Sequence, residues 1–291
     1  MHEERNGLPA LQTIILTAAA MLAFAANSLL CRLALQQGGI DPASFASIRL
    51  VSGAITLAAI VRFRTARPSS GHADWLAAAM LFAYVALFSF AYLSLPAGTG
   101  ALILFGAVQL TMFIVGLRSG EMFGAIAWLG LALAVAGLVY LVSPGVAAPP
   151  LLGAALMAVA GVAWGVYSLR GRGVLDPLAA TAGNFARAAP LALVLSLLSV
   201  ANAYANAAGV VLAIASGALT SGLGYVIWYA ALSRLSAMRA ATVQLSVPLI
   251  AAFGGVAFLS EAITPRLAAA SAAILGGIAL VLASRQKKPR R

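Results

Sequence analysis

Three long stretches without a single acidic or basic residue decide what this chain can fold into. They run over 75–117, 122–169 and 188–233. A helix needs roughly 20 apolar residues to cross the hydrocarbon core of a bilayer, so each stretch has room for about two crossings joined by a short turn. The runs are continuously apolar, whereas the strands of a membrane barrel alternate between apolar and polar residues. The chain is therefore predicted to be an all-α integral membrane protein.

The charge balance does not point to a nucleic-acid partner. Only 9% of the 291 residues are charged, against about 25% in ordinary soluble domains. The net charge is +11, but the basic residues are spread over short loops and the C-terminus, as orientation signals in membrane proteins are. The predicted surroundings are therefore the lipid bilayer. Cys31 is the single cysteine, so no intramolecular disulfide can form.

Turn-forming residues divide the chain into ten predicted spans. The apolar run after the N-terminal "MHEERNG" is too long for the core of a signal peptide, so it is expected to remain as the first span. The predicted spans are 10–32, 43–62, 74–94, 98–117, 121–142, 151–170, 178–201, 209–232, 238–259 and 264–284.

The positions of Lys and Arg predict the orientation of these spans. If the N-terminus is cytoplasmic, the cytoplasmic segments hold 14 of the 18 basic residues. The loops at 95–97, 143–150 and 202–208 carry no charge and are then placed outside. Cytoplasmic loops of membrane proteins are enriched in Lys and Arg, so both termini are predicted to be cytoplasmic.

The two halves of the chain resemble each other. At a shift of 140 residues, Leu11–Leu29 matches Leu151–Leu169 at several positions, and Glu121 meets Glu261. The predicted units are a five-helix repeat over 1–145 and a second over 146–291, which ends in a basic cytoplasmic tail. Because each unit has an odd number of spans, the second must be inverted relative to the first. Inverted repeats are typical of secondary transporters, whose substrate site lies near the midplane between them.

The sequence lacks the groups of catalytic residues that a membrane-embedded enzyme would need. Both histidines, His2 and His72, fall in predicted cytoplasmic loops. No cluster of His, Cys and carboxylates suits a metal, no Ser–His–Asp set lies within the spans, and no phosphate-binding loop is present. No cofactor, metal or enzymatic activity is therefore predicted.

The charged residues near the membrane suggest how a substrate would be handled. All seven acidic residues fall in loops or at span ends, so no carboxylate relay for protons lies at the midplane. This favours a neutral or zwitterionic substrate and facilitated diffusion. Arg49 and Arg187 are the charges well inside spans. They could capture a substrate carboxylate or fix neighbouring helices, and we favour the second interpretation.

Three aromatic residues near mid-span are candidate cavity residues. Tyr84 belongs to a stripe with Phe88 and Tyr92 at helical spacing, and Trp164 and Tyr225 lie in the sixth and eighth spans. Such stripes can serve packing alone. A buried hydroxyl or indole N–H nevertheless needs a polar partner, which a cavity would supply.

Three amides in the spans pose the same choice. Asn27, Gln109 and Gln244 lie within apolar segments. A mid-membrane amide must hydrogen-bond to protein, water or ligand. It can therefore join helices or face a cavity that meets polar atoms of a substrate.

Several motifs resemble a known family. "AWGVY" at 163–167, "SGE" at 119–121 and "SEAI" at 260–263 resemble the drug/metabolite transporter superfamily, whose EamA-like members have ten transmembrane helices. "ALILFGAVQLTMFIVGLRSGE" and "VQLSVPLIAAFGGVAFLSEAIT" look like the bacterial aromatic amino acid exporters within it. The resemblance extends over residues 10–284.

The resemblance implies a basket of ten helices around a central cavity in the bacterial inner membrane. The family's tryptophan of the sixth span falls on Trp164, and its cavity tyrosine on Tyr84. Phe24 and Arg32 replace the tryptophan and lysine common in the first span. The acidic residue of the small multidrug relatives has no counterpart, which disfavours multidrug antiport.

We therefore predict a monomeric exporter of neutral amino acids with aromatic or large apolar side chains, working as a uniporter by alternating access. The substrate site is predicted to comprise Asn27, Tyr84, Gln109, Trp164, Tyr225 and Gln244. The alternative is an exporter of other small metabolites or drugs, with or without proton coupling.

Overall fold

The computed structural model describes residues 3–64, 74–120, 122–171, 174–232, 234–235 and 237–284. Within these residues the chain is helical, and pairing of strand type is limited to an isolated bridge between Ile40 and Ala205. The helices are α1 (Glu3–Gln36), α2 (Pro42–Phe63), α3 (Trp75–Ala91), α4 (Ala97–Arg118), α5 (Ala125–Val142), α6 (Leu151–Arg170), α7 (Pro177–Leu198), η1 (Val200–Asn202), α8 (Ala207–Ala215), η2 (Ser216–Leu223), α9 (Gly224–Leu232), α10 (Ala237–Gln244), α11 (Ser246–Leu259) and α12 (Pro265–Ser284).

The predicted spans correspond to these helices. Nine segments of the described chain have at least 18 residues and are apolar enough to cross a membrane, and α3 is a shorter apolar helix of 17 residues. α1 begins two turns before its predicted span, because a helix need not end where the bilayer does. Glu121 and the basic tail of 285–291, on which parts of the repeat and orientation predictions rest, lie outside the described residues.

Two aspartates explain where α2 and α7 begin. Asp41 and Asp176 each precede a proline at the first helical position, where the missing N–H is not needed. The Asp41 carboxylate accepts hydrogen bonds from the N–H groups of Ala43 and Ser44, at 3.1 and 2.9 Å. The Asp176 carboxylate accepts one from Ala179 N–H at 3.1 Å. These caps satisfy donors that no helical carbonyl can reach.

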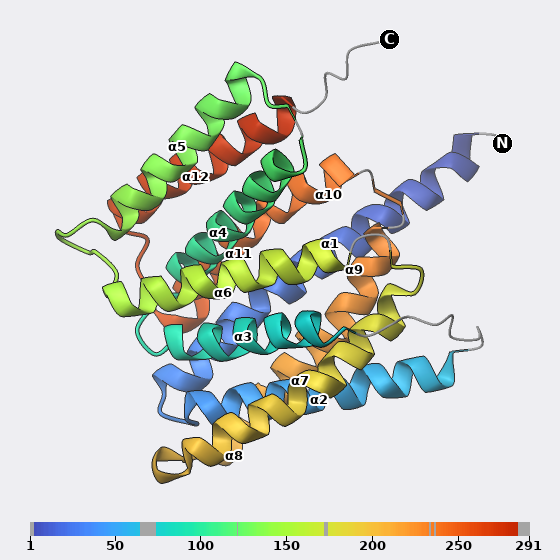
Figure 1. The fold of residues 1–291 in the computed structure, drawn as a ribbon, viewed down its shortest axis with the longest axis vertical. Helices are drawn as coiled ribbons and strands as arrows, with labels where there is room; N and C mark the ends of the chain where they lie inside the picture. Colours follow the sequence, from blue (N-terminus) through green and yellow to red (C-terminus); the bar gives the residue numbers. More distant parts are fainter. Residues whose placement is uncertain are drawn as a thin grey trace.

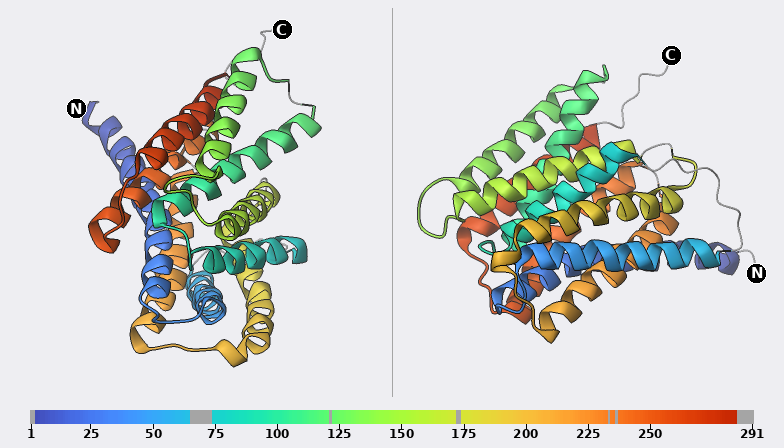
Figure 2. Two further views of the ribbon diagram at one scale, coloured as in Figure 1. Left: turned by 90° about the vertical axis from the view of Figure 1, so that its left-hand side faces the viewer. Right: turned by 60° about the horizontal axis from the view of Figure 1, so that its bottom comes forward.

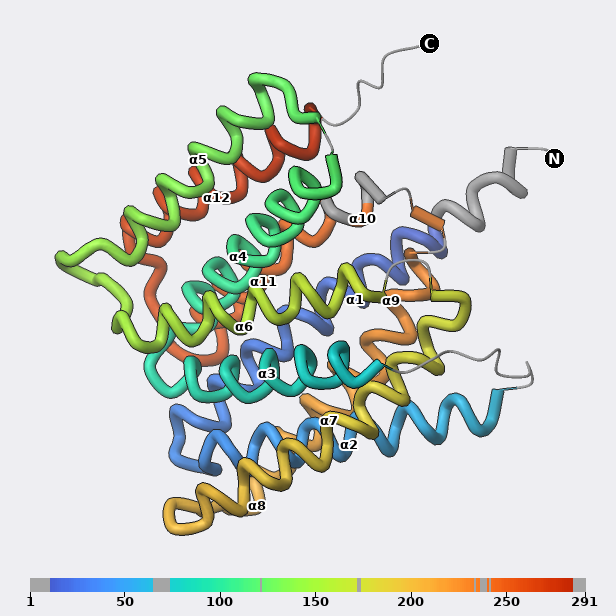
Figure 3. Tube along the Cα trace, viewed as in Figure 1, coloured from blue at the N-terminus to red at the C-terminus, as the bar shows by residue number. Residues whose placement is uncertain are grey.

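The helices pack in pairs drawn from opposite halves of the chain. α5 lies beside α12 at one edge of the bundle, and α2 lies beside α7 at the other (Figures 1 and 2). α1 crosses the length of the bundle between them (Figure 3) and packs against α9, η2 and α11. Two glycines bring α5 and α12 close. A Cβ on Gly130 would lie 2.5 Å from the Gly277 oxygen, so only glycine fits this crossing.

The outer surface is apolar. Leu152, Leu198 and Phe258 are each more than 70% exposed, which suits contact with lipid rather than water. Buried side chains such as Phe45, Phe88 and Leu102 fill the interior of the bundle instead. Together with the span lengths, this distribution identifies a multi-pass membrane protein.

Two spans of the second half are interrupted. Between α8 and α9 the chain forms η2, eight residues of π-helix. Between α10 and α11 it turns at Leu245, whose N–H bonds the Thr242 oxygen three residues back at 3.1 Å. Pro248 explains this second break, because it has no N–H to offer the carbonyl of Gln244. Pro190 lies inside α7 without breaking it.

Ion pairs tie helix ends together at both ends of the bundle. At the end where α1 starts, Arg64 pairs with Asp176 and Arg170 pairs with Asp74. At the far end, Arg32 pairs with Glu261 at 3.3 Å. The second oxygen of Glu261 accepts a hydrogen bond from the N–H of Ala97, the first residue of α4, at 2.8 Å.

Candidate functional site

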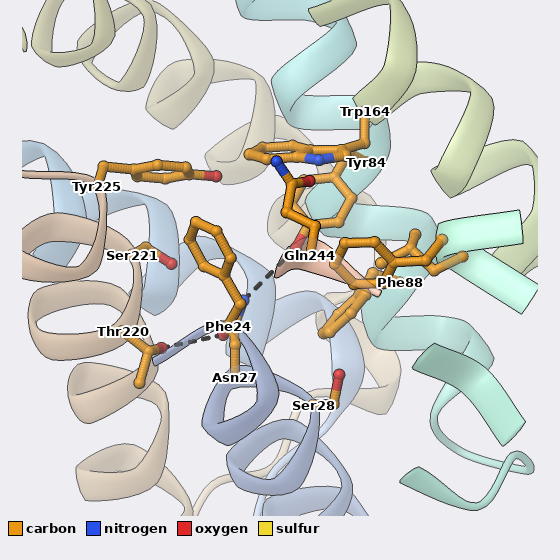
Figure 4. Close-up of a pocket in the computed structure, with 12 residues that line it drawn as sticks. Phe24, Asn27, Ser28, Tyr84, Phe88, Trp164, Thr220, Ser221, Tyr225 and Gln244 are labelled. Carbon is orange, nitrogen blue, oxygen red and sulfur yellow. Dashed lines mark hydrogen bonds between the residues drawn. The ribbon is translucent and has the colours of Figure 1, made fainter. Parts of the chain in front are cut away.

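A small pocket lies in the middle of the bundle (Figure 4). Residues of α1, α3, α4, α6, η2, α9 and the last residue of α10 form its wall. Its volume is about 30 Å³, which is room for one or two water molecules. The lining residues are Phe24, Asn27, Ser28, Tyr84, Phe88, Leu104, Phe105, Trp164, Thr220, Ser221, Tyr225 and Gln244.

Five of the six predicted site residues meet at this pocket. Asn27, Tyr84, Trp164, Tyr225 and Gln244 come from five different helices and all line it.

Gln109 does not line the pocket. α4 reaches the wall through Leu104 and Phe105, and Gln109 lies about one turn farther along the same helix. Its side chain is half-buried and forms no hydrogen bond with a described residue.

Aromatic rings form one side of the pocket. The Trp164 ring lies 4.8 Å from the Tyr84 ring and 5.6 Å from the Tyr225 ring, measured between centroids. Trp164 and Tyr225 are stacked, with 26° between their planes. The Phe24 ring of α1 lies 6.0 Å from the Tyr225 ring in a tilted arrangement, and Phe88 lies 5.4 Å from Tyr84. This wall offers flat apolar faces that suit an aromatic or large apolar group.

A polar network faces the rings from α1 and η2. The Asn27 Oδ1 atom accepts hydrogen bonds from the hydroxyls of Ser216 and Thr220, at 2.5 and 3.2 Å. Its Nδ2 atom points at the Tyr84 hydroxyl at 3.5 Å, which is too long for a strong bond. The Asn27 amide is therefore held by η2 and aimed at the pocket, and its N–H groups remain weakly engaged.

Arg49 of α2 lies directly behind this wall. Its side chain is 1% exposed, and it is the largest of the fully buried side chains among the described residues. Nε donates to the Ser221 hydroxyl at 3.2 Å, and Nη2 donates to the Tyr84 hydroxyl at 3.0 Å. The guanidinium also covers the Phe88 ring at 5.0 Å. Gly217 of η2 allows this approach, because a Cβ there would lie 2.3 Å from the Arg49 oxygen.

Arg187, the other arginine within a span, occupies a different setting. Its guanidinium lies over the exposed Trp75 ring at 5.6 Å and donates to the Gly183 oxygen at 3.4 Å. It does not line the pocket. The two arginines, which the sequence did not distinguish, therefore have different surroundings.

Comparison with known proteins supports the same class of molecule. Residues 151–283 match the EamA-like transporter family. The chain is 51% identical over 284 residues to uncharacterized protein PA1977 of Pseudomonas aeruginosa, and the match covers 98% of this chain and 99% of that protein.

Residues 151–283 therefore form an EamA-like transporter domain. The chain also matches a solved structure, described only as the crystal structure of a protein, with a TM-score of 0.67 and 20% identity. That match covers 94% of this chain and 99% of the other, and it bears on the fold alone. The EamA-like domain points to a membrane transporter of small molecules rather than an enzyme.

Several residues of the pocket are absent from the predicted set. Phe88 could have been found, since it belongs to the same helical stripe as Tyr84. Thr220 and Ser221 interrupt an apolar span, which is a signal for a polar site, but their role depends on η2. The remaining pocket residues without a predicted role are Phe24, Ser28, Leu104 and Phe105.

The described residues contain no group of three or more His, Cys, Asp or Glu side chains that could hold a metal ion. The polar groups at the pocket are amides, hydroxyls and, behind them, one guanidinium. This arrangement can bind and orient a small molecule through hydrogen bonds and ring contacts.

Proposed function

We propose that this protein exports neutral amino acids with aromatic or large apolar side chains across the bacterial inner membrane. The observation that carries this proposal is the pocket itself. The Trp164 ring stacks on Tyr225 and lies beside Tyr84, and the amides of Asn27 and Gln244 line the same pocket. An amino acid has the same two-sided character, with an apolar side chain and polar backbone groups.

In this proposal each side of the pocket has its own task. The three rings pack against the substrate side chain, and the amides of Asn27 and Gln244 meet its polar atoms. Gln109, which lies beyond the closed pocket, meets polar atoms only as the cavity opens along α4.

The cavity must change shape during transport. Its volume of about 30 Å³ holds a water molecule or two, far less than an amino acid requires. The ion pairs at both ends of the bundle support the interpretation of this form as closed on both sides. We assign it to the occluded step of an alternating-access cycle.

An inverted repeat would supply the two states of that cycle, and the packing pattern supports one. If the two halves exchange places, the pairs α2–α7, α5–α12 and α4–α11 map onto themselves. The pair α3–α6 then maps onto α1–α9, α4–α6 onto α1–α11, and α2–η2 onto α3–α7. Each of these helix pairs is in contact, as an approximate twofold relation between residues 1–145 and 146–291 requires.

Uniport fits the composition of the pocket. None of its lining residues is acidic, so the site itself offers no carboxylate to carry a coupled proton. We place both termini in the cytoplasm, from the distribution of Lys and Arg, and treat the monomer as the working unit.

Uptake into proteoliposomes tests the proposal. Purified protein would be reconstituted and offered labelled Phe, Leu, Met and Thr, with and without a proton gradient. We expect saturable uptake of Phe, Leu and Met that a proton gradient does not accelerate. Absence of uptake by protein that elutes as a single folded species would refute amino acid transport. Acceleration by the gradient would refute uniport alone.

A further inference from the structure

Arg49 is a buried positive charge that has no acidic partner among the residues that the structure describes. Within the described part of the chain, no carboxylate lies within ion-pair distance of it. The described acidic side chains are engaged elsewhere: Asp41 with backbone N–H groups, Asp74 with Arg170, Asp176 with Arg64, and Glu261 with Arg32 and Ala97.

The guanidinium is also incompletely hydrogen-bonded. It carries five N–H donors in a planar fork. Nε and Nη2 reach two neutral hydroxyls, whereas Nη1 is fully buried and has no hydrogen-bond partner in the described part of the chain. The rings of Tyr84 and Phe88, at 5.2 and 5.0 Å, offset part of the cost of burying the charge. An unpaired donor on a buried cation in the membrane is nevertheless costly and marks a site that an anion can complete.

The two hydroxyls that Arg49 contacts belong to the pocket wall. Tyr84 and Ser221 line the pocket, and so does Phe88, whose ring the guanidinium covers. A single layer of side chains therefore separates the charge from the cavity. When the cavity expands, movement of the Tyr84 hydroxyl exposes Nη1 and Nη2 together on one edge of the fork.

We infer that Arg49 binds the carboxylate of the transported molecule. This inference rests on the proposed function and deepens it, because it identifies the substrate as an organic carboxylate with an aromatic or large apolar side chain. Nη1 and Nη2 donate to the two carboxylate oxygens, which is the geometry that arginine favours over lysine. In the closed form the Tyr84 hydroxyl occupies the place of the carboxylate.

This arrangement also orients the ligand. With the carboxylate at Arg49 on the α2 side, the apolar side chain lies along Trp164 and Tyr225. A substrate ammonium group then faces the Gln244 amide oxygen rather than an acidic residue. Arg49 accordingly sets specificity for the acid over its neutral amide, because the amide would leave the guanidinium without its anion.

The test compares two ligands that differ only at the group that Arg49 would bind, which is a carboxylate in one and a neutral carboxamide in the other. Uptake of labelled phenylalanine by the wild-type protein is measured with unlabelled phenylalanine or phenylalaninamide as competitor. We expect the amide to compete at least tenfold less well. Equal competition by the two compounds would overturn the inference while leaving amino acid transport intact.

Substitutions of Arg49 provide a second test of the inference. In Arg49→Gln, phenylalanine uptake should fall at least tenfold, and the preference for the acid over the amide should disappear. Arg49→Lys should keep part of the preference, because it keeps the charge. Arg187→Gln is the matched control, since it removes an arginine of α7 that does not line the pocket, and it should keep both uptake and preference. An Arg49→Gln protein that retains the preference would overturn the inference.

A third measurement works without transport and without variants. Thermal unfolding of the detergent-solubilised wild-type protein is followed with 3-phenylpropionate or 3-phenylpropionamide, which both lack the amino group. A ligand that binds the folded protein raises its unfolding temperature. Stabilisation by the acid alone supports carboxylate binding at this site even if uptake of amino acids fails. Equal stabilisation by both, or by neither, counts against it.

Discussion

The tripeptide Val-Gln-Leu occurs twice in the chain, and its two copies lie in different structural settings. In α4 the segment 108–110 lies in an unbroken helix, and Gln109 stays outside the pocket. In the ninth span the segment 243–245 falls where α10 ends and α11 begins, and Gln244 lines the pocket. Because Pro248 cannot bond the Gln244 carbonyl, the helix turns there and directs the amide inward.

The eighth span is also interrupted, and its interruption also supplies polar residues to the pocket. The π-helical segment η2 supplies Thr220 and Ser221 to the wall and Ser216 to the Asn27 network. By contrast, the unbroken helices α3 and α6 contribute the rings of Tyr84, Phe88 and Trp164. Interrupted helices therefore deliver much of the polar chemistry, whereas regular helices mainly deliver ring faces. π-Helical turns are frequently found at functional sites.

The largest effect is expected from filling the close contact behind η2. A Cβ on Gly217 would lie 2.0 Å from the Ser52 hydroxyl oxygen and 2.3 Å from the Arg49 oxygen. Gly217→Ala must therefore push η2 away from α2, at a cost of about 2–3 kcal/mol. We expect the unfolding temperature in detergent to fall by about 5 °C or more.

Gly276→Ala is the matched control for Gly217→Ala. A Cβ on Gly276 of α12 meets no atom within 4 Å. The unfolding temperature of this variant should stay constant or rise slightly, since Ala favours a helix over Gly. Equal loss of stability in both variants would mean that η2 has no special packing requirement.

The next effect concerns the ring wall on a regular helix. Trp164→Ala removes contacts with both Tyr84 and Tyr225. We expect uptake per folded protein to fall about tenfold or more, since each aromatic pair contributes on the order of 1 kcal/mol. Trp128→Ala, on the lipid-exposed side of α5, is the control and should transport normally. Normal uptake by a well-folded Trp164→Ala protein would remove Trp164 from the site.

The two glutamines give the most direct test of the comparison. Gln244→Ala should lower the apparent affinity for phenylalanine about fivefold, because one hydrogen bond to the substrate is worth about 1 kcal/mol. Gln109→Ala should cause a smaller fall, because its amide lies beyond the closed pocket. The measurement is the concentration dependence of uptake for both variants side by side. A larger effect at Gln109 would reverse the distinction between broken and unbroken helices.

The smallest effect is expected at a helix start far from the interruptions. The hydrogen bond from the Arg64 guanidinium holds the pKa of Asp176 below its usual range. Asp176→Asn keeps a capping oxygen for α7 but loses the ion pair, so the unfolding temperature should fall by about 2–3 °C at neutral pH.

The pH dependence checks the origin of that loss. Because the folded pKa of Asp176 is lowered, its contribution is complete above the unfolded pKa of about 4 and disappears as the pH falls through the folded pKa. The gap between wild-type and Asp176→Asn unfolding temperatures should thus stay constant from about pH 5 to 8 and narrow below about pH 4. A gap that is independent of pH down to acid conditions would exclude the ion pair as its cause.

The sequence predicted the helical architecture well because uncharged runs of this length have few alternatives. Five of the residues that it singled out, since polar and aromatic groups in an apolar span need partners, line one pocket, and their role in substrate binding stays a prediction: Asn27, Tyr84, Trp164, Tyr225 and Gln244.

The role of Arg49 and the positions of the interruptions depend on hydrogen-bond register and on which helices cross. A single sequence specifies neither the hydrogen-bond register nor the helix crossings. Arg49 and Arg187 are both arginines within apolar spans, so the sequence alone does not separate them. In the structure Arg49 lies behind the pocket wall, where Gly217 lets η2 approach α2 closely.

The small cavity has a consequence for the direction of net flux. In a carrier that alternates between two sides, the empty protein must also return. Here the Phe24 and Trp164 rings both lie against Tyr225, and the Tyr84 hydroxyl satisfies part of the Arg49 guanidinium, so the pocket that the described residues enclose at this site is small. Under the proposed function, a carrier with so little empty space at its site can reset without cargo, which suits release of molecules down their gradient rather than strict one-for-one exchange.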